Sequence, residues 1–456
     1  MCNIAEVAMS RSAKSLRING PCTVRGSISV PGDKSISHRV AMLASVAGGV
    51  SSVTGFGSSA DCQSTLDCVR RLGVEVERAD GTVVIRGRGL GGYRPGREPV
   101  RLDAGNSGST IRMISGLLAG QKFTSEIDGD DSLRRRPMRR VIEPLTLMGA
   151  AIDARDQNFA PLTIRGAALR PIRYISPVAS AQVKTCVLFG GLYADGQTIF
   201  SEPAPSRNHT EIMLREFGAH LDSSNSDLAV ELRIEGGFEL TPVDYHVPGD
   251  VSSAAFFIAA ATILPNSTLS IKGVSLNPTR TAFIDVLNRL GANAIADNVR
   301  TVNGEAVGDI HVASCALKAE QPSTVLAGDI IPNIIDEIPI LAVAATQVEG
   351  RLEVRDAREL RIKESDRVST VANGIRSMGG EIEEFDDGFA IEGPQSLKGG
   401  RVETEGDHRI AMAFTIAGLM AEGTTEIIGA DCAAVSFPEF YELIAAVTQE
   451  GTLEHE

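Results

Sequence analysis

The 456-residue sequence predicts an α/β protein of two domains, each built from three similar units. Two observations support this prediction. A helix that ends in glycine and leads into a short strand recurs six times, and the turn Val-Pro-Gly-Asp occurs twice, at residues 30–33 and 247–250. Alternating strands and helices are typical of α/β architecture, and a chain of this length is too long for one ordinary hydrophobic core.

The six helices share a C-terminal glycine, whose freedom to adopt a left-handed conformation suits the position just after a helix. Successive glycines are roughly 70 to 90 residues apart, and this near-constant period indicates repeated units rather than chance helix capping. Three units precede the second Val-Pro-Gly-Asp turn and three follow it, so we expect a cleft between two three-unit domains. The helices are expected at residues 61–72, 138–148, 209–217, 279–290, 363–378 and 437–450, before Gly73, Gly149, Gly218, Gly291, Gly379 and Gly451.

The first turn leads from a predicted strand at residues 25–30 into a helix that begins at Ser35. Lys34 and Arg39 therefore lie near a helix N-terminus, where free N–H groups and the helix dipole favour an anion. The second turn has Val251 in place of Lys34, which indicates that the turn is architectural and that Lys34 has a chemical role. A capped surface helix with a solvated lysine and arginine is the alternative.

Composition limits the possible function classes. A net charge of −14 and an aromatic content of 4% without tryptophan speak against a nucleic-acid partner, and no apolar run is long enough to span a membrane. An anion must therefore be bound by a local cluster of cations. Seven cysteines without a Cys-x-x-Cys pair indicate reduced thiols in a cytoplasmic protein. Residues 1–17 lack the apolar segment of a signal peptide, so we expect a loose leader there.

Neither a metal ion nor a nucleotide cofactor is expected. No spacing of His, Asp and Glu resembles that of metal ligands, and no Walker A sequence occurs. Residues 87–92 fit Gly-x-Gly-x-x-Gly, but Pro95 and Pro99 prevent the helix that a dinucleotide-binding turn requires. We interpret that segment as an ordinary turn.

Several further turns place hydroxyls, amides and cations at predicted helix starts. Asn106 and Gly108 belong to a small-residue turn in which Gly108 would let a ligand approach the backbone. Arg136 is one of five arginines at another predicted helix start. Cations at this end of a helix oppose the helix dipole, which indicates a nearby anion. Similar helix starts lie at residues 180–182 and 206–211. A purely capping or solvated role is the alternative in each case.

The second half of the chain contributes carboxylates as well as cations. Asp336 and Glu337 lie in an apolar stretch, where desolvation would raise a pKa and suit general acid–base catalysis. Helix capping by Asp336 is the alternative. Lys363 and Arg367 are expected on one face of a helix, with intrahelical salt bridges as the alternative. Arg409 lies at one more turn before a helix.

Cations at element ends thus occur in both halves of an acidic protein. Their distribution predicts a cleft that binds phosphate and carboxylate groups through charge-assisted contacts, worth about 1.5–3 kcal/mol each. Without ligand the cations would repel one another, so we expect the domains to stand apart until anions bind. The residues are Lys34, Arg39, Arg136, Arg207, Lys363, Arg367 and Arg409.

The motifs, in this order, resemble those of the EPSP synthase family, the 3-phosphoshikimate 1-carboxyvinyltransferases, from about residue 30 to residue 443. Ser-Ala-Gln at 180–182, Ser-Arg-Asn-His-Thr-Glu at 206–211 and Ser-Phe-Pro-Glu-Phe at 436–440 are similar to the bacterial class II branch. Two positions depart from the family patterns. Val435 stands where class I has a lysine, which removes that ligand, and Gly108 stands where class II often has alanine.

The resemblance implies an inside-out α/β barrel of two domains, each with three βαβαββ repeats and with the active site in the cleft between them. The domains are expected at residues 1–31 with 249–456, and at residues 32–248. The implied reaction transfers the enolpyruvyl group of phosphoenolpyruvate to the 5-hydroxyl of shikimate 3-phosphate and releases phosphate, in chorismate and aromatic amino acid biosynthesis. This chemistry needs a base, an acid and an anion clamp but no cofactor. We expect a cytoplasmic monomer.

Residue roles follow from the matching positions. Asp336 is the expected base at the 5-hydroxyl, and Lys34 and Glu364 are candidates for proton transfer at the methylene carbon of phosphoenolpyruvate. The residues expected to bind shikimate 3-phosphate are Lys34, Ser35, Arg39, Ser180, Ala181, Gln182, Arg207, Asp336 and Lys363. Those expected to bind phosphoenolpyruvate are Lys34, Asn106, Gly108, Arg136, Gln182, Arg367 and Arg409.

Three alternatives remain open from the sequence. The UDP-N-acetylglucosamine 1-carboxyvinyltransferase family shares the fold but carries a reactive Cys or Asp ahead of its Arg-Pro. Residues 127–140 contain no cysteine, although Asp130 and Asp131 are present. An enzyme like the RNA 3′-phosphate cyclases would show a basic stripe, which the net charge of −14 opposes. A structural repeat protein would leave the pair of Asp336 and Glu337 unexplained.

Overall fold

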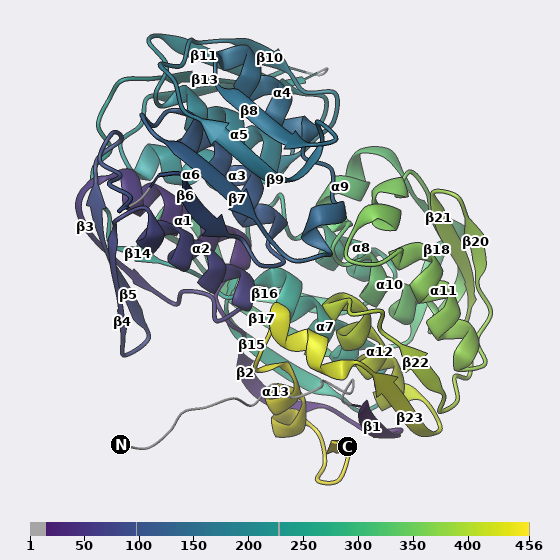
Figure 1. The fold of residues 1–456 in the computed structure, drawn as a ribbon. Helices are drawn as coiled ribbons and strands as arrows, with labels where there is room; N and C mark the ends of the chain where they lie inside the picture. The colour runs from purple at the N-terminus through teal and green to yellow at the C-terminus, as the bar shows by residue number, and fades with distance from the viewer. Residues whose placement is uncertain (1–14, 97, 227–228, 456) are drawn as a thin grey trace, which may run out of the picture.

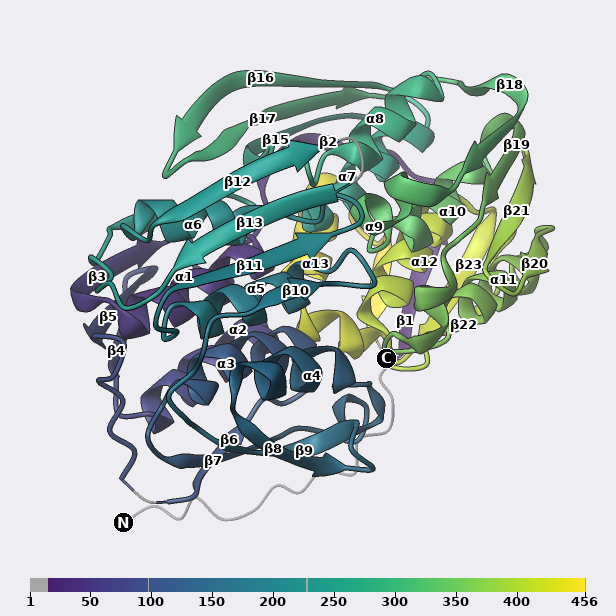
Figure 2. The same cartoon turned by 90° about the horizontal axis from the view of Figure 1, so that it is seen from above.

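The computed structural model describes residues 15–96, 98–226 and 229–455, which form two lobes with separate hydrophobic cores (Figure 1; Figure 2). One core gathers buried residues between Ile36 and Val247, and we call this part the first lobe. The other core combines residues 16–30 with residues 251–447 and belongs to the second lobe. The prediction of an α/β protein with two three-unit halves is confirmed.

Each lobe contains three four-stranded sheets of one pattern, in which one pair of neighbouring strands is parallel and the other two pairs are antiparallel. The second unit of the first lobe has the chain order β6–α3–β7–α4–β8–β9, which is the βαβαββ repeat expected from the sequence. The sheets of the first lobe are β14 (Tyr245–His246), β3 (Gly48–Thr54), β5 (Thr82–Arg88), β4 (Glu75–Ala79); β6 (Val100–Asp103), β7 (Thr124–Asp128), β9 (Phe159–Arg165), β8 (Ala151–Arg155); and β10 (Arg173–Ile175), β11 (Gln197–Glu202), β13 (Ala229–Glu235), β12 (Leu221–Ser226).

The second lobe takes two of its strands from the start of the described chain. β1 lies between β23 and β24, and β2 lies at the edge of a sheet beside β15. Residues 15–17 therefore belong to a strand, and the expectation of a loose leader was wrong for them; residues 1–14 lie outside the described part. The sheets are β16 (Asn293–Val302), β17 (Glu305–Ala313), β15 (Thr268–Ser275), β2 (Arg25–Ser29); β18 (Leu317–Leu326), β19 (Val348–Val354), β21 (Gly388–Gly393), β20 (Glu383–Phe385); and β22 (Arg401–Glu403), β23 (Gly423–Ile428), β1 (Ser15–Gly20), β24 (Leu453–His455).

All six predicted helices are present, and five begin within three residues of the predicted start. The last ends at Val447 with Thr448 in the cap position, so the expected terminal glycine, Gly451, was wrong for it. The fifth, α11, begins only at Arg367, because Asp366 occupies the cap position and accepts a hydrogen bond from the Ser369 N–H. Lys363 precedes the helix, after a 3₁₀ turn at Arg358–Ile362, so the prediction that it shares a helix face with Arg367 was wrong. The six helices are α2 (Ala60–Arg71), α4 (Arg139–Met148), α6 (His209–Glu216), α8 (Ala282–Arg289), α11 (Arg367–Ser377) and α13 (Phe440–Val447).

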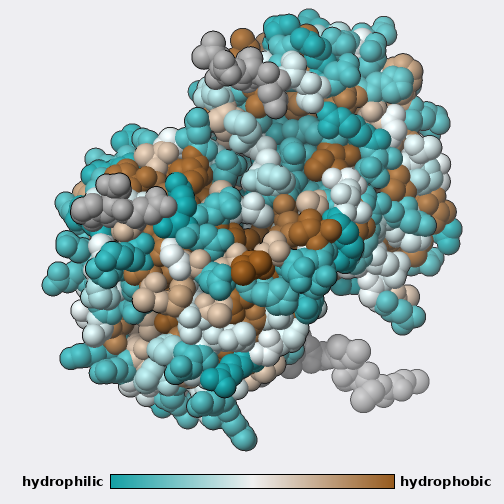
Figure 3. Space-filling model, turned by 180° about the vertical axis from the view of Figure 1, so that it is seen from behind, coloured by the Kyte–Doolittle hydropathy of each residue, from teal (hydrophilic) through white to brown (hydrophobic). Residues whose placement is uncertain are grey.

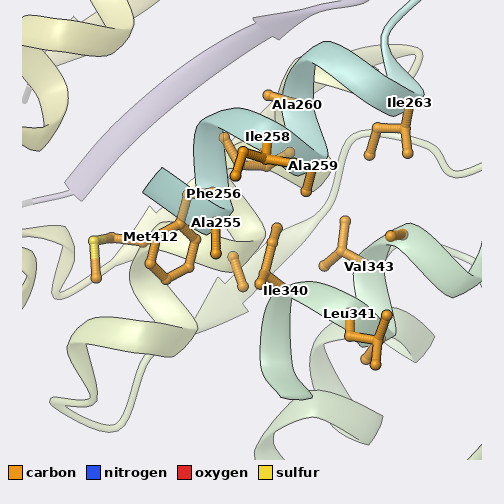
Figure 4. Close-up of a cluster of buried hydrophobic side chains, with 14 of the residues drawn as sticks. Ala255, Phe256, Ile258, Ala259, Ala260, Ile263, Ile340, Leu341, Val343 and Met412 are labelled. Atoms are coloured by element: carbon orange, nitrogen blue, oxygen red, sulfur yellow. The ribbon is translucent and has the colours of Figure 1, made fainter. Parts of the chain in front are cut away.

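Six other helices form the interior of the lobes. They are apolar on nearly all sides, and such helices are stable only when surrounded by protein. Every residue of α7 is buried, and Figure 4 shows Phe256 and Ala259 of α7 beside Ile340 of α10 and Met412 of α12. The inner helices are α1 (Lys34–Val46), α3 (Gly108–Ala119) and α5 (Ala181–Gly191) in the first lobe, and α7 (Val251–Ile263), α10 (Ile338–Ala345) and α12 (His408–Met420) in the second.

The chain crosses between the lobes at the two Val-Pro-Gly-Asp turns. The two segments run antiparallel, with hydrogen bonds from Asp33 N–H to Pro248 O (2.8 Å) and from Asp250 N–H to Pro31 O (2.9 Å). A Cβ at Gly32 would lie 1.7 Å from the carbonyl oxygen of Gly55, so only glycine fits there. The repeated turn is therefore an architectural joint, as its second copy predicted.

Other features bear on the expected class of protein. Gly87 and Arg88 end β5, and the segment after them forms no helix among its described residues. The interpretation as an ordinary turn is confirmed for residues 89–92, where the Gly92 N–H donates to the Gly89 carbonyl oxygen. None of the helices in the described ranges is long and apolar enough to cross a bilayer. The six described cysteines, Cys22, Cys62, Cys68, Cys186, Cys315 and Cys432, are free thiols. From behind, the surface is mostly hydrophilic, with apolar residues scattered among polar ones (Figure 3).

Candidate active site

A cleft with a volume of about 440 Å³ lies where the inner helices of both lobes begin. N-terminal residues of α1, α3, α5, α7 and α12 line it, and Asp336 contributes from just ahead of α10. The positive ends of several helix dipoles thus face one cavity, which favours anions. Thirteen residues proposed from the sequence line this cleft: Lys34, Ser35, Gly108, Arg136, Ser180, Ala181, Gln182, Arg207, Asp336, Lys363, Glu364, Arg367 and Arg409.

Lys34 is the first residue of α1, and its orientation depends on the cap of that helix. Asp33 accepts a hydrogen bond from the Ile36 N–H (2.9 Å), and Lys34 Nζ lies 2.9 Å from Asp61 Oδ2. Burial acts to lower the pKa of Lys34, but the Asp61 carboxylate outweighs it and holds that pKa above the ordinary value. Lys34 therefore carries its proton beside Asp61.

Arg39 lies one layer behind the cleft surface, with 2% of its area exposed. Its guanidinium donates to the hydroxyls of Thr210 (2.7 Å) and Thr185 (3.0 Å) and to the carbonyl oxygen of Ser35 (2.8 Å). Burial, with a contribution from Arg207, lowers the pKa of Arg39 to about 10. Arg39 thus joins α1, α5 and α6 beneath the cleft rather than lining it.

Arg136 connects the second unit of the first lobe to the second lobe. It donates to Asn106 Oδ1 (2.6 Å), and its Nη1 lies 3.2 Å from Glu364 Oε1 across the cleft. Asn106 therefore contributes behind Arg136 and is not itself among the residues that line the cleft. A Cβ at Gly108 would lie 3.0 Å from Arg112 Nη1 and 3.5 Å from Arg136 Nη1. The absence of a side chain at Gly108 leaves room for these guanidinium groups.

Gln182, in the first turn of α5, is held at both ends of its amide. Arg112 donates to Gln182 Oε1 (2.8 Å), and Gln182 Nε2 donates to Ser109 Oγ (3.0 Å). Ser180 caps the helix through the Val183 N–H. The three-residue motif at 180–182 therefore presents a hydroxyl, a backbone and a fixed amide to the cleft.

Asp336 is surrounded by arginines from both lobes. Arg207 of the first lobe donates to its Oδ2, Arg367 Nη1 lies 3.6 Å from Oδ1, and Arg409 Nη2 lies 3.7 Å from Oδ2. Burial acts to raise the pKa of Asp336, but the charges of Arg409, Arg207, Lys363 and Arg367 outweigh it and hold that pKa well below the ordinary value. The sequence-based expectation of a raised pKa was wrong for Asp336, because it considered the apolar neighbours in sequence and not the cations that converge in space; for Glu337 it is confirmed.

The alternative of a capping role for Asp336 was also wrong. Glu337 occupies the cap position of α10 and makes no side-chain cap bond. Glu337 is 2% exposed and accepts a hydrogen bond from Ser252 Oγ. Its pKa is raised, first by burial and then by the neighbouring Asp336 charge.

Arg367 lies deepest among the cleft-lining arginines, with 1% of its side chain exposed. It pairs with Glu364 (2.6 Å) and with Asp407 (2.8 Å). The pair with Glu364 that was weighed from the sequence is present, but it is not intrahelical, because Glu364 precedes α11. Burial opposes ionisation of Glu364, but Arg367 and Arg136 outweigh it and hold the pKa of Glu364 well below the ordinary value. Arg367 Nη1 has no hydrogen-bond partner. The same is true of Arg112 Nε and Arg136 Nε.

Carboxylates lie between the cations of the cleft. Asp336 and Glu364 lie between arginines of the two lobes, and Glu359 lies 3.4 Å from Arg140 of the opposite lobe. These carboxylates reduce the repulsion between the cations. The expectation that the domains stand apart until anions bind stays a prediction. In the described ranges, no cluster of three His, Cys, Asp or Glu side chains could hold a metal ion.

Several residues that line the cleft were not proposed from the sequence. Arg112 follows Gly108 by one turn of α3, so helical spacing could have identified it. Arg140 lies in the arginine-rich segment that includes Arg136, but Arg136 precedes α4, so no helical spacing relates the two. Nothing in the sequence distinguished Asp61 from an ordinary acidic residue near a helix start. The residues not proposed include Asp61, Arg112, Arg140, Asp250, Arg280, Glu359 and His408.

Comparison with known proteins identifies the family. The family model described as EPSP synthase (3-phosphoshikimate 1-carboxyvinyltransferase) matches residues 18–444 of this chain. The chain belongs to the EPSP synthase family. Curated 3-phosphoshikimate 1-carboxyvinyltransferases from Thermoanaerobacter sp. (strain X514) and Solibacter usitatus are each 48% identical to it, over 92% of this chain and 96% of the former protein, and over 95% of this chain and 99% of the latter.

Solved structures agree with this family assignment. EPSP synthase from Acinetobacter baumannii superposes with a TM-score of 0.84 at 40% identity, over 97% of this chain and 100% of that chain. The enolpyruvyl transferase NikO from Streptomyces tendae has a TM-score of 0.77 at 15% identity, over 98% and 99% of the two chains, which is a likeness of fold alone. The fold is that of the enolpyruvyl transferases, as the family resemblance implied. The UDP-N-acetylglucosamine, RNA cyclase and structural-repeat alternatives are not favoured.

Proposed function

We propose that this chain transfers the enolpyruvyl group of phosphoenolpyruvate to the 5-hydroxyl of shikimate 3-phosphate, releasing phosphate, in aromatic amino acid biosynthesis. Family membership over residues 18–444 supports the reaction. The single structural observation that carries the proposal is the convergence of Lys34, Arg136, Arg207 and Arg409 on one cleft. Two small substrates with phosphate and carboxylate groups match that charge.

Asp336 is the proposed base at the 5-hydroxyl. Among these arginines it is ionised but a poor base, because Arg409, Arg207 and Arg367 stabilise its charge. Substrate phosphate and carboxylate groups that bind these arginines would neutralise part of that field. The pKa of Asp336 would then rise toward the range in which a carboxylate accepts a proton, so substrate binding itself prepares the base.

Lys34 is the proposed acid at the methylene carbon. The ionised Asp61 keeps Lys34 protonated, whereas Glu364 is held ionised between Arg136 and Arg367 and has no proton to give. The hydroxyl oxygen would attack carbon 2 of phosphoenolpyruvate while the methylene carbon gains the Lys34 proton. The tetrahedral intermediate would then expel phosphate and lose a proton from the new methyl group, which restores the double bond.

The substrate roles assigned from the family motifs are retained as part of this proposal. Arg39 and Asn106 act in it from behind the cleft surface, through Ser35 and Arg136 respectively. The domain boundaries at residues 31–32 and 248–249 also remain a proposal, supported by the hydrogen-bonded crossing of the chain at those points. A cytoplasmic location is proposed on the cysteine usage of the sequence, and action as a monomer on the family resemblance.

The test is phosphate release from phosphoenolpyruvate by the purified chain, with shikimate 3-phosphate or UDP-N-acetylglucosamine as acceptor. We expect release that depends on shikimate 3-phosphate and a product whose mass is that of the 5-enolpyruvyl ether. Release that depends on the UDP-sugar, or none with either acceptor, would contradict the proposal.

A further inference from the structure

Lys184 is a buried cation that does not line the cleft. It lies one turn into α5, and 1% of its side chain is exposed. Its Nζ lies 2.9 Å from Glu202 Oε1, 2.7 Å from Glu211 Oε1 and 3.2 Å from the carbonyl oxygen of Ser206. The ammonium group donates hydrogen bonds to Glu202 and to the Ser206 carbonyl, and the Glu211 carboxylate adds an ion pair. Pairing of this kind offsets the cost of removing a charge from water.

The partners of Lys184 fix one residue of an irregular loop. Residues 203–208 connect β11 to α6 without regular secondary structure. Within this loop, the Ser206 N–H donates to Glu202 Oε1 (3.0 Å), and the Ser206 hydroxyl donates to both oxygens of the same carboxylate (2.9 and 2.7 Å). Because Lys184 binds the Ser206 carbonyl, the backbone of Ser206 is held on both sides.

The residue after Ser206 is Arg207, whose guanidinium reaches Asp336 and lies 3.4 Å from Ser35 Oγ. A loop held at Ser206 therefore determines where the Arg207 side chain enters the cleft. Lys184 also belongs to the helix whose first turn carries residues 180–182, and Glu211 belongs to α6, which starts two residues after Arg207. One ammonium group thus joins the three segments around this corner of the cleft.

We propose that Lys184 is a positioning residue for the shikimate 3-phosphate subsite, which fixes the Arg207 loop against the N-terminal turn of α5. This inference rests on the proposed function, because that function assigns Arg207 and residues 180–182 to this substrate. The rival explanation is a buried ion cluster that only stabilises the first lobe. The two differ in which kinetic constant changes when the cluster is removed.

Two variants separate these explanations. Lys184→Met leaves Glu202 and Glu211 buried without their counter-ion, so it tests folding as much as function. The triple variant Lys184→Met/Glu202→Gln/Glu211→Gln removes all three charges and keeps an acceptor for the Ser206 N–H. Lys318→Met is the matched control, since it removes one lysine charge from an exposed ion pair with Glu349 in the second lobe.

Steady-state phosphate release at 25 °C, with each substrate varied in turn, gives the decisive constants. For the triple variant we expect KM for shikimate 3-phosphate to rise about tenfold or more and KM for phosphoenolpyruvate to change by less than about threefold. When Arg207→Ala is already present, the triple substitution should change KM for shikimate 3-phosphate by less than about twofold, because two residues that act through one contact are not additive. The control should match the unmodified chain.

Several results would overturn the proposal. One is a folded triple variant with an unchanged KM for shikimate 3-phosphate. Another is an equal rise in KM for both substrates. A third is the same rise in KM for shikimate 3-phosphate with and without Arg207→Ala. Failure of both Lys184 variants to fold would assign the cluster to stability alone. If the unmodified chain releases no phosphate with shikimate 3-phosphate, the proposed function itself fails. The assay of the unmodified chain therefore distinguishes that failure from a failure of the Lys184 proposal.

Discussion

The guanidinium of Arg207 and the carboxylate of Asp336 belong to different lobes and form an ion pair across the cleft. Arg207 lines the cleft and points its guanidinium at this carboxylate. Arg409, Arg207, Lys363 and Arg367 together hold the pKa of Asp336 well below its ordinary value. In the proposed mechanism, a substrate phosphate or carboxylate that binds Arg207 would weaken this pair and raise the pKa of Asp336, so that binding would prepare the base.

Replacement of the proposed base gives the first prediction. We expect Asp336→Asn to fold normally and to lose about 100-fold or more in kcat, since the amide cannot accept the proton of the 5-hydroxyl. Phosphate release and the thermal midpoint of unfolding measure the two properties. Asp329→Asn, at an exposed carboxylate of the same cleft, should keep kcat within about threefold. Comparable losses in both variants would remove the special role of Asp336.

Gly108→Ala should selectively weaken the binding of phosphoenolpyruvate. Its new Cβ would lie 3.0 Å from Arg112 Nη1 and 3.5 Å from Arg136 Nη1, so these guanidinium groups must shift. We expect KM for phosphoenolpyruvate to rise several-fold and KM for shikimate 3-phosphate to change by less than about twofold, in steady-state assays. Gly91→Ala is the control, because nothing lies within 4 Å of its added Cβ. An unchanged KM for phosphoenolpyruvate would show that the Arg112 and Arg136 positions tolerate the methyl group.

Arg280 should be essential for stability at the joint between the lobes. It is buried and lies 3.2 Å from Asp33 Oδ2 and 3.4 Å from Asp250 Oδ1, the two aspartates of the repeated turn. Arg280→Met leaves these buried carboxylates without a counter-ion, which costs about 3–5 kcal/mol. Urea unfolding measures the loss. Arg401→Met breaks an exposed pair with Glu403 and should cost less than about 1 kcal/mol; equal losses would contradict the prediction.

Acidification should destabilise the protein through buried histidines. Burial lowers the pKa of His38 to about 3 and that of His408 to about 4. Between pH 6.5 and pH 4 the unfolded chain therefore binds protons at these positions while the folded chain does not, so stability falls with falling pH. Each histidine contributes up to about 3 kcal/mol over this interval.

The histidine prediction is measured by urea unfolding from pH 8 to pH 4. Below pH 6.5, His38→Asn should reduce the slope of the unfolding free energy against pH by the contribution of about one bound proton. Above pH 7 the slope should be unchanged. The substitution lowers stability at every pH by removing the ring, so the slope and not the absolute value is decisive. An identical slope in both proteins would contradict burial of neutral His38.

The sequence predicted the repeated architecture well because its signals are local. A glycine after an outer helix and a Pro-Gly-Asp joint are properties of a few adjacent residues, and they occur where expected at Gly73, Gly149 and Gly32. The start of α11 was missed because the Asp366 cap competes with a longer helical pattern. Local capping outweighed periodicity there.

The electrostatics of the site could not be predicted in the same way. The apolar sequence around Asp336 indicated a raised pKa, but Arg207 and Arg409, which lower it, are more than 70 residues away along the chain. Lys184 likewise gave no signal, because its partners Glu202 and Glu211 belong to other elements. Residues that act through such distant contacts become visible only once the fold brings the segments together.

The most direct test of the account is a crystal structure of the chain with shikimate 3-phosphate and a non-reactive analogue of phosphoenolpyruvate. We expect both ligands in the cleft, with phosphate or carboxylate oxygens within about 3.5 Å of Lys34, Arg207 and Arg409, and the 5-hydroxyl within hydrogen-bond reach of Asp336. Ligands bound outside the cleft, or a 5-hydroxyl that faces away from Asp336, would contradict it.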